Sequence, residues 1–487
     1  MKDSLAHLYE SRRYAECKAA CLDWLADQPS NLSARKLLIR SLTALGHLDE
    51  SLMQCDQSLL YCDTASEEAE ILFFKGEIYS NSQQDELALQ SFTTALQKDD
   101  TKVSTAFMLA YTTYRLNRFD ESRSFCMSLL ERGTSVPPAL YGHTIYLLAQ
   151  MDRSMVFDDL RQYLLKVSPD LPVPFFHYGV AELLDRQEEY LSAFQHYEAA
   201  NALIRKDRPY PFGGDLNALK QYQAMFSGDF FSRLEPLARD SREPIPIFIV
   251  GMPRSGSSLL EQMLGEHSEI TPQGEVTWLR DAFEKYRNEL SNPKDPNFIV
   301  DACLDHEFRA RLRDYYLTQM DDVQTSYFTD KLPGNHAYGF LIHSLFPDAL
   351  VIHLKRDRIA TLWSCFKTPF TVGHRYSESL VECYQYIAAV ERMMAHWKSM
   401  FSDRIFTLDY ETLIDEPEAS LSEVFSKLNL DLEPSCLEPH KSQRIVNTAS
   451  RNQVIQPLYA SANKQVAPYI GYIEDRLGEG LKPEVSR

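Results

Sequence analysis

The chain has 487 residues, more than one ordinary domain holds, so we expect two or more domains. Hydrophobic residues make up 44% and charged residues 24%, as in folded globular proteins, which excludes a largely disordered chain. The formal net charge of −19 argues against a general nucleic-acid-binding surface.

Cysteine usage and hydropathy bear on the compartment. Nine cysteines are scattered without a C-x-x-C pair or a regular spacing, which favours a reducing environment. The first residues are polar and helical in pattern, without the apolar core of a signal peptide. No stretch approaches the ~18 apolar residues of a membrane span. We therefore expect a soluble, cytoplasmic protein.

Residues 1–204 are helical in pattern and repeat themselves. Turn residues recur about every 34 to 36 residues, which resembles the period of the tetratricopeptide repeat (TPR), with two helices per unit. The turns are centred on Gln28, Cys62, Lys98, Arg132 and Ser168. We expect an all-α TPR solenoid of about six units, of which the fifth (136–170) is the most degenerate.

A solenoid of this kind leaves a concave face free. It could dock a peptide or a protein partner, or it could support the second domain or a homodimer. The sequence leaves these roles open, and it does not identify the face used.

Residues 205–243 break the period. Turn-rich stretches at 208–214 and 240–246 flank a segment that reads as one or two helices rich in aromatic residues. We interpret this segment as a packed helical connector, followed by a second domain at 244–487.

The second domain opens on the segment Pro246–Leu260. A run of β-favouring residues ends at Gly251, a short loop of small polar residues follows, and apolar residues then resume at helical spacing. Backbone N–H groups and the helix dipole make such a helix start an anion site. The hydroxyls of Ser255, Ser257 and Ser258 add donors, so we expect this loop to bind a phosphate.

The loop differs from a nucleotide-hydrolysing P-loop at one position. Gly251 and Gly256 have P-loop spacing, but Ser257 stands where the P-loop lysine would be. That lysine neutralises the outer phosphates of a nucleoside triphosphate, so its loss argues against ATP or GTP hydrolysis. Arg254 supplies a cation instead.

Alternating strand and helix signals follow. Strands are expected at 326–329, 349–354 and 404–408, and each ends in charged or polar residues before a helical stretch. This pattern predicts an α/β domain with a central parallel sheet and its ligand groups at the carboxyl ends of the strands. Arg356 at one strand end and Ser364 two helical turns later could hold a second phosphate, away from the first loop.

The loop 253–258 together with Arg356 and Ser364 resembles the two cofactor motifs of sulfotransferases, over about residues 245–472. The resemblance is closest to tyrosylprotein sulfotransferases and to TPR-containing bacterial sulfotransferases, and it implies a P-loop-like fold. It also implies 3′-phosphoadenosine-5′-phosphosulfate (PAPS) as the cofactor, with no metal. Ser255, Gly256, Ser257 and Ser258 would hold the 5′-phosphosulfate, and Arg356 and Ser364 the 3′-phosphate.

The same resemblance assigns catalytic roles. Glu275 would be the general base that takes a proton from the acceptor hydroxyl, and Lys331 would stabilise the departing oxygen. Arg254 would neutralise charge on the transferring group. Further contacts to PAPS are implied at Tyr410, Ser450 and Lys464. Four histidines are weaker candidates for the base, because none lies in a motif: His267, His336, His343 and His353.

The leading hypothesis is sulfuryl transfer from PAPS to a hydroxyl, favouring a peptide tyrosine because Glu275 and Lys331 follow that subfamily. A saccharide or lipid hydroxyl is the alternative acceptor. A nucleotide kinase on the same P-loop topology and a catalytically inactive TPR scaffold are the alternatives from other classes.

Overall fold

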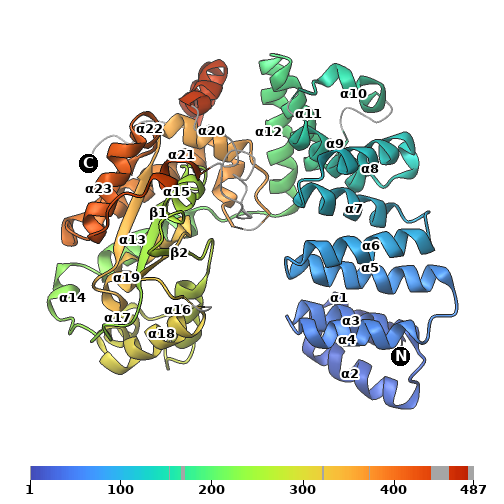
Figure 1. Cartoon of the computed structure of the whole chain (residues 1–487), viewed down its shortest axis with the longest axis horizontal. Coiled ribbons are helices and arrows are strands. Elements are labelled where there is room, and N and C mark those ends of the chain that lie inside the picture. Colours follow the sequence, from blue (N-terminus) through green and yellow to red (C-terminus); the bar gives the residue numbers. More distant parts are fainter. Residues whose placement is uncertain are drawn as a thin grey trace. The chain divides into compact units, whose positions relative to one another are not determined.

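The computed structural model describes residues 2–152, 154–165, 171–320, 323–371, 373–439 and 460–480. The chain divides into two compact units, Met1–Leu203 and Ile204–Arg487 (Figure 1). In the parts that the structure describes, no helix is both long and apolar enough to cross a membrane. The predicted sites at Ser450 and at the side chain of Lys464 lie outside the described residues.

The first unit consists of helices that follow one another as hairpins, shown in blue to green in Figure 1. The pairs are α1 (Lys2–Glu10) and α2 (Tyr14–Asp27), α3 (Leu32–Ala44) and α4 (Leu48–Leu59), α5 (Ala65–Asn81) and α6 (Asp85–Lys98), α7 (Val103–Arg115) and α8 (Phe119–Glu131), α9 (Pro138–Met151) and α10 (Phe157–Leu164), and α11 (Pro174–Arg186) and α12 (Tyr190–Asp207). A short 3₁₀ helix, η1 (Gly133–Ser135), precedes α9.

The sequence repeat is also a repeat of backbone geometry. In five hairpins, the residue two positions before the second helix has a left-handed backbone conformation, with φ between 58° and 78°. These residues are Arg12, Gly46, Gln83, Asn117 and Glu188. The same tight turn therefore joins the two helices each time, whatever side chain stands there.

Small side chains let the paired helices approach closely. Cys17, Ser51 and Ser122 are fully buried near the start of their helices. Each donates a hydrogen bond to a backbone carbonyl of the preceding helix: Cys17 Sγ to Leu5 (3.5 Å), Ser51 Oγ to Ile39 (2.9 Å) and Ser122 Oγ to Ala110 (2.5 Å). A larger side chain at these positions would force the two helices apart.

The second unit is built on a parallel five-stranded sheet with the order β2-β3-β1-β4-β5. The strands are β1 (Ile245–Gly251), β2 (Ile270–Pro272), β3 (Tyr327–Asp330), β4 (Leu350–Lys355) and β5 (Ile405–Asp409). All four strand pairs are parallel, as predicted. β1 is the central strand, with β3 on one side and β4 on the other. The order of the strands reverses direction at β1, and ligands of such sheets usually bind at the carboxyl ends of the strands at this point.

Helices surround this sheet. They are α13 (Gly213–Met225), α14 (Gly228–Ser232), α15 (Ser257–Leu264), α16 (Trp278–Arg287), α17 (Pro296–Leu304), α18 (His306–Thr318), α19 (Gly339–Leu345), α20 (Arg358–Phe366), α21 (Leu380–Met400), α22 (Tyr410–Asp415), α23 (Pro417–Leu428) and α25 (Ile470–Gly480). Short 3₁₀ helices are η2 (Pro333–Tyr338), η3 (Arg375–Glu378), η4 (Pro434–Leu437) and η6 (Ala460–Tyr469).

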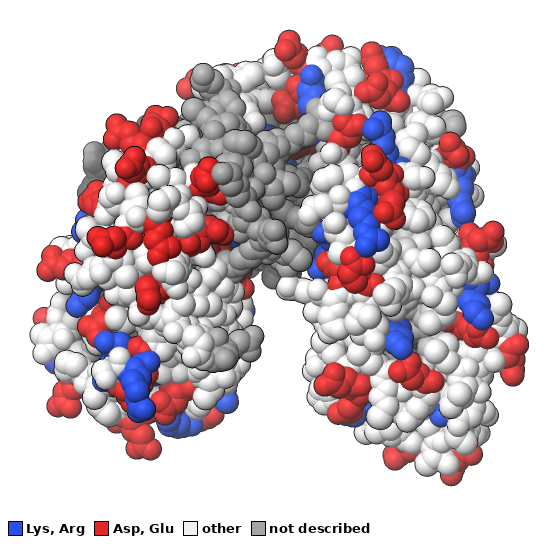
Figure 2. Space-filling model, viewed as in Figure 1, with Lys and Arg blue, Asp and Glu red and all other residues white. Residues whose placement is uncertain are grey.

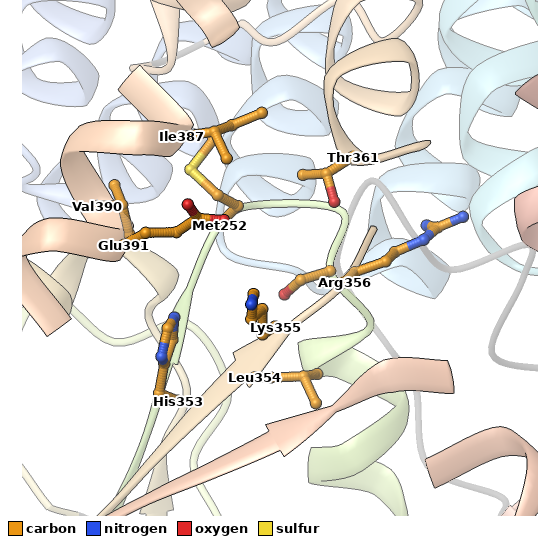
Figure 3. A pocket seen from close by; sticks show the side chains of 10 residues that line it. Met252, His353, Leu354, Lys355, Arg356, Thr361, Ile387, Val390 and Glu391 are labelled. Carbon is orange, nitrogen blue, oxygen red and sulfur yellow. The ribbon is translucent and has the colours of Figure 1, made fainter. Parts of the chain in front are cut away.

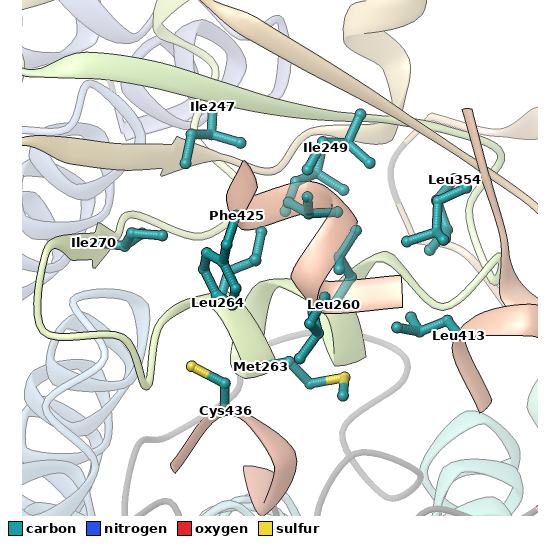
Figure 4. Packing of buried hydrophobic residues seen from close by; sticks show 14 of the residues in the cluster. Ile247, Ile249, Leu260, Met263, Leu264, Ile270, Leu354, Leu413, Phe425 and Cys436 are labelled. Atoms are coloured by element: carbon teal, nitrogen blue, oxygen red, sulfur yellow. The ribbon is translucent and has the colours of Figure 1, made fainter. Parts of the chain in front are cut away.

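One apolar core fixes the helix that follows the loop. Side chains of β1, β2 and β4 meet those of α15, α22 and α23 (Figure 4). The buried residues labelled in Figure 4 are Ile247, Ile249, Leu260, Met263, Leu264, Ile270, Leu354, Leu413, Phe425 and Cys436. Because α15 is buried along its whole length, its amino-terminal end cannot shift without disturbing this core.

The predicted connector groups with the second unit. Phe226, after α13, stacks on Phe340 of α19 with ring centroids 3.7 Å apart. Two arginines of α18 donate to backbone carbonyls of the extended stretch that follows α14: Arg309 to Glu235 (2.7 Å) and Arg313 to Ala238 (2.6 Å). This segment is therefore packed against the sheet domain by aromatic contacts and buried hydrogen bonds.

Charged side chains are distributed over both units. On the face shown in Figure 2, acidic and basic side chains of the described residues are interspersed, and the acidic ones prevail. This distribution agrees with the formal net charge of −19.

Candidate active site

The loop between β1 and α15 has a backbone that requires its glycines. Gly251 has φ +147°, and a Cβ there would lie 2.5 Å from the Leu354 carbonyl oxygen. Gly256 has φ +101°, and a Cβ there would collide with the Tyr410 ring. Arg254, between them, also has a left-handed conformation, with φ 67°. The loop is therefore tightly constrained, and two glycines let it pass close to β4 and to Tyr410.

The serines of the loop are buried at the start of α15. Ser255, Ser257 and Ser258 are 1%, 6% and 4% exposed. Among the described residues, the Ser255 hydroxyl is buried without a hydrogen-bond partner. An unpartnered buried hydroxyl beside a helix start is suited to a phosphate oxygen. These residues therefore fit the phosphate group that the sequence predicts for this loop.

The second predicted motif lies against the first. Ser364 of α20 accepts a hydrogen bond from Arg254 Nε at 3.2 Å, and Arg356 Nη1 donates to the Arg254 carbonyl at 2.9 Å. The Arg356 guanidinium also covers the Tyr410 ring, 4.9 Å from its centroid. The two motifs are thus joined through Arg254, and a second phosphate held by Arg356 and Ser364 stays a prediction. Tyr410 packs on Gly256 and holds Arg356, which places it at the same site.

A small cavity lies behind the loop, between β4, α20 and α21 (Figure 3). Its volume of about 20 Å³ suffices for one water molecule and not for a nucleotide. Ser255 and Thr361 line it, and both hydroxyls are buried without a partner in the described part of the chain. In Figure 3 the Arg356 side chain extends away from the other labelled lining residues.

Lys331 and Glu275 form an ion pair on the other side of the loop. The Lys331 side chain has no exposed surface, and its Nζ lies 2.6 Å from Glu275 Oε1. The same ammonium lies 3.4 Å from Ser258 Oγ. Glu275 is 42% exposed and hence reachable from solvent. The structure thus brings together two of the three predicted catalytic residues, Glu275 and Lys331, and one of the loop serines.

A buried carboxyl precedes Lys331 in the chain. Asp330 accepts hydrogen bonds from Tyr316 and from Asn335, both at 2.9 Å. Burial raises the pKa of Asp330 to about 8, although these two hydrogen bonds oppose the rise. Burial thus favours the protonated, uncharged form of this carboxyl in the folded protein.

The histidines considered as alternative bases lie in closed environments. Burial lowers the pKa of His336 to about 4, of His343 to about 3 and of His353 to about 4. His336 Nδ1 contacts the Pro333 carbonyl at 2.9 Å and its Nε2 contacts Tyr386 at 3.4 Å, so both nitrogens are engaged. His267 bonds the Asp431 carbonyl at 3.0 Å through Nε2.

Sequence reasoning missed two residues near the site. His374 lies close enough to Glu275 for the carboxylate to raise its pKa, although burial lowers that pKa more. Glu261, on α15, is buried beside Lys331, with its Oε2 4.0 Å from Nζ. The signal that could have found Glu261 is a charged residue inside an otherwise apolar helix face, five residues after the second loop glycine.

Comparisons with known proteins relate part of the second unit to sulfotransferases. Residues 246–434 match the Sulfotransferase family. The chain is similar to an uncharacterized protein of Aquifex aeolicus, with 31% identity over 63% of this chain and 42% of that protein. It is also similar to protein-tyrosine sulfotransferase 2 of Gallus gallus, with 25% identity over 48% of this chain and 66% of that protein. The chain thus spans roughly half the length of the curated relatives it matches.

Among solved structures, the sulfotransferase domain from the Synechococcus PCC 7002 olefin synthase matches 52% of this chain and 100% of that domain. The sequence identity is 19% and the TM-score is 0.36, values at which the likeness carries no argument about function.

Proposed function

We propose, from the premise that residues 246–434 form a sulfotransferase-family domain, that this protein transfers a sulfuryl group from PAPS to an acceptor hydroxyl. The observation that carries the proposal is the ion pair of the buried Lys331 with Glu275, beside a P-loop-like loop without its lysine. Lys331 brings to this loop the cation that Ser257 cannot provide.

The cofactor would be bound by the residues that the two motifs contribute. When bound, PAPS supplies the activated sulfuryl group. The hydroxyls of Ser255, Ser257 and Ser258 and the start of α15 would hold its 5′ end. Arg356 and Ser364 would hold its 3′-phosphate. Ser364 accepts a hydrogen bond from Arg254, and a hydroxyl that accepts one bond still has its proton to donate.

The acceptor would be activated by Glu275. Its carboxylate takes the proton from the acceptor hydroxyl oxygen, a role suited to an exposed carboxylate next to the loop. Lys331 donates a hydrogen bond to the oxygen that leaves, which requires the cation to face the loop, as its contact with Ser258 supports. Arg254 donates a hydrogen bond to Ser364. Its role in neutralising charge on the transferring group stays a prediction.

A peptide tyrosine is the acceptor we favour, because Glu275 and Lys331 follow the tyrosylprotein sulfotransferase pattern and because a curated relative carries that activity in its name. The helical hairpins of the first unit, which we assign to the TPR class, would then dock the acceptor or a partner protein. Their regular turns and shared helix packing support this assignment.

The first test is calorimetric titration with PAP, the desulfated product, and with ATP. We expect wild type to bind PAP and not ATP, and Arg356→Ala to bind PAP ~10- to 100-fold more weakly, since charged hydrogen bonds are lost. Arg358→Ala is the matched control, because Arg358 is the first residue of α20, two positions after Arg356, but pairs with Glu391 instead. ATP binding without PAP binding would contradict the proposal.

If PAP binds, labelled PAPS identifies the acceptor. Tyrosine peptides, saccharides and lipids with free hydroxyls are offered in parallel. Transfer to tyrosine peptides alone is expected, and transfer to a saccharide or a lipid alone would keep the reaction but change the acceptor class.

A further inference from the structure

A second carboxylate lies beside Lys331 and has no part in the proposed transfer. Glu261 is buried on α15, within the helix that starts at the loop. Its Oε1 accepts a hydrogen bond from the Gly274 N–H at 2.8 Å and another from the Thr329 hydroxyl at 2.8 Å. Its Oε2 lies 4.0 Å from Lys331 Nζ. The carboxylate therefore links the loop helix, β3 and the turn after β2.

That turn is the segment that presents Glu275. Gly274 has a left-handed backbone, with φ 77°, and its peptide groups are bound on both sides. Glu261 accepts from its N–H, and its carbonyl accepts from the Lys331 N–H at 3.0 Å. The preceding Gln273 N–H bonds the Thr329 carbonyl at 3.3 Å. Since the Glu275 side chain is 42% exposed, its direction depends on this backbone more than on packing around it.

We propose that Glu261 is a positioning residue that holds the Gly274 turn so that Glu275 faces Lys331 and the acceptor. The inference rests on the proposed function for the role of Glu275. The contacts themselves involve no cofactor, so the turn can be probed in the free protein.

The charge of Glu261 has a further consequence. When Glu275 takes the acceptor's proton, it no longer balances the buried ammonium of Lys331. The Glu261 carboxylate, 4.0 Å from that ammonium, remains as its counter-charge. A variant that keeps the hydrogen bonds but removes the charge separates this electrostatic effect from the positioning.

The test uses the full chain with three substitutions: Glu261→Leu, Glu261→Gln and, as the matched control, Gln262→Leu. Gln262 is the next residue on α15, is equally buried and donates to the Pro439 carbonyl, away from the turn. Four quantities are measured: hydrogen exchange, without ligand, of the peptide that contains Gly274; PAP affinity; and kcat and KM for sulfuryl transfer.

We expect Glu261→Leu to speed exchange at Gly274 about tenfold or more, because its amide loses a charged acceptor. We expect kcat to fall ~10²-fold, as for a displaced catalytic group, with PAP affinity unchanged. Glu261→Gln keeps an amide oxygen for the Gly274 N–H, so its exchange stays slow and part of kcat returns. Gln262→Leu leaves both exchange at Gly274 and kcat at wild-type values.

Unchanged exchange in a folded Glu261→Leu variant overturns the proposal, and so does faster exchange with wild-type kcat. If wild type neither binds PAP nor transfers sulfate, the proposed function fails, while faster exchange still supports Glu261 as the residue that holds the turn. If Glu261→Leu does not fold, Thr329→Val is used instead, because it removes the other hydrogen-bond donor to Glu261. We then expect faster exchange at Gly274 and a lower kcat, both by smaller factors.

Discussion

At the residue scale, Lys331 is a lysine without exposed side-chain surface, a position that a lysine occupies only when it is paired. Its partners are a carboxylate at 2.6 Å and a loop serine at 3.4 Å. A lysine after a strand is usually solvated, so the burial itself is the unusual fact. It is consistent with a cation kept beside the loop in place of the missing P-loop lysine.

Replacement of the proposed base tests this site directly. Glu275→Gln keeps the size and one oxygen for Lys331 but cannot accept the acceptor's proton. We expect kcat to fall ~10²- to 10⁴-fold, the usual contribution of a general base, and PAP affinity to stay unchanged. The control is Glu269→Gln, an exposed carboxylate earlier in the same segment that bonds Ser326. Wild-type kcat in Glu275→Gln would remove Glu275 from the mechanism.

The buried carboxyl of Asp330 predicts how stability changes with pH. Burial raises its pKa to about 8 in the folded state, whereas an unfolded aspartate titrates at about 4. Between these values the folded state keeps a proton that the unfolded state has lost. The contribution to stability is therefore fully present below about pH 4 and is lost as the pH rises through about 8.

Asp330→Asn replaces this carboxyl with a neutral amide of the same shape. Scanning calorimetry measures the Tm of the second unit in the variant and in wild type. We expect the variant's Tm, relative to that of wild type, to rise steadily from pH 5 to pH 8. Asp314 is exposed on α18. For Asp314→Asn we expect the difference in Tm from wild type to be the same at every pH. Parallel pH profiles for Asp330→Asn and wild type would contradict the raised pKa.

At the element scale, the hairpins of the first unit depend on close contact between helices. Gly76 of α5 faces Phe92 of α6, and a Cβ at Gly76 would lie 2.5 Å from the ring. Phe92 is fully buried, so its ring cannot shift without disturbing the side chains packed around it. The glycine is therefore kept for packing, against its poor helix propensity.

In an open helix, Gly→Ala stabilises by up to ~1 kcal/mol through helix propensity. For Gly76→Ala we expect the opposite sign, a loss of ~1–3 kcal/mol from overpacking. Combining it with Phe92→Leu should recover part of the loss, so that the two changes are not additive. Chemical denaturation of Gly76→Ala, Phe92→Leu and the double variant measures these differences in the free energy of unfolding. A stabilised Gly76→Ala would contradict the prediction, because it would show that the Phe92 ring makes room for the added methyl group.

At the scale of the whole molecule, the two units differ in how far apart in the sequence their contacting residues lie. The first is a succession of local hairpins, and the second is a sheet whose strands pair across long stretches of chain, such as β1 with β3 and β4. The segment 205–243 packs on the second unit through Phe226 and through the carbonyls that Arg309 and Arg313 bind.

This packing predicts where the chain can be cut. A fragment 204–487 should fold and bind PAP, as measured by circular dichroism and calorimetry. A fragment 244–487 should fold poorly, because Arg309 would lose the Glu235 carbonyl and Phe340 would lose the stacked Phe226 ring, which leaves a buried charge short of an acceptor and an apolar face uncovered. Equal folding of the two fragments would show that the connector is dispensable.

Much of this architecture could be predicted from the sequence because its signals are local. A helical period, a turn between paired helices and an apolar run before a glycine each depend on neighbours along the chain. They therefore indicated the hairpins, β1, β3, β4 and β5, and the loop that follows β1. The three-residue strand β2 was not predicted, because Ile270–Pro272 is too short for a period and ends in a proline.

The sequence by itself determined the parallel sheet, the glycine-flanked loop after β1 and the residue types that this domain can offer at its candidate site. Only the tertiary structure decided which of them meet. Arg254 contacts Ser364, Lys331 contacts Glu275, and Glu261 holds Gly274, although each pair lies far apart in the chain or on different elements. Such contacts depend on strand order and on helix packing, which bring distant residues together without leaving a pattern in the local sequence.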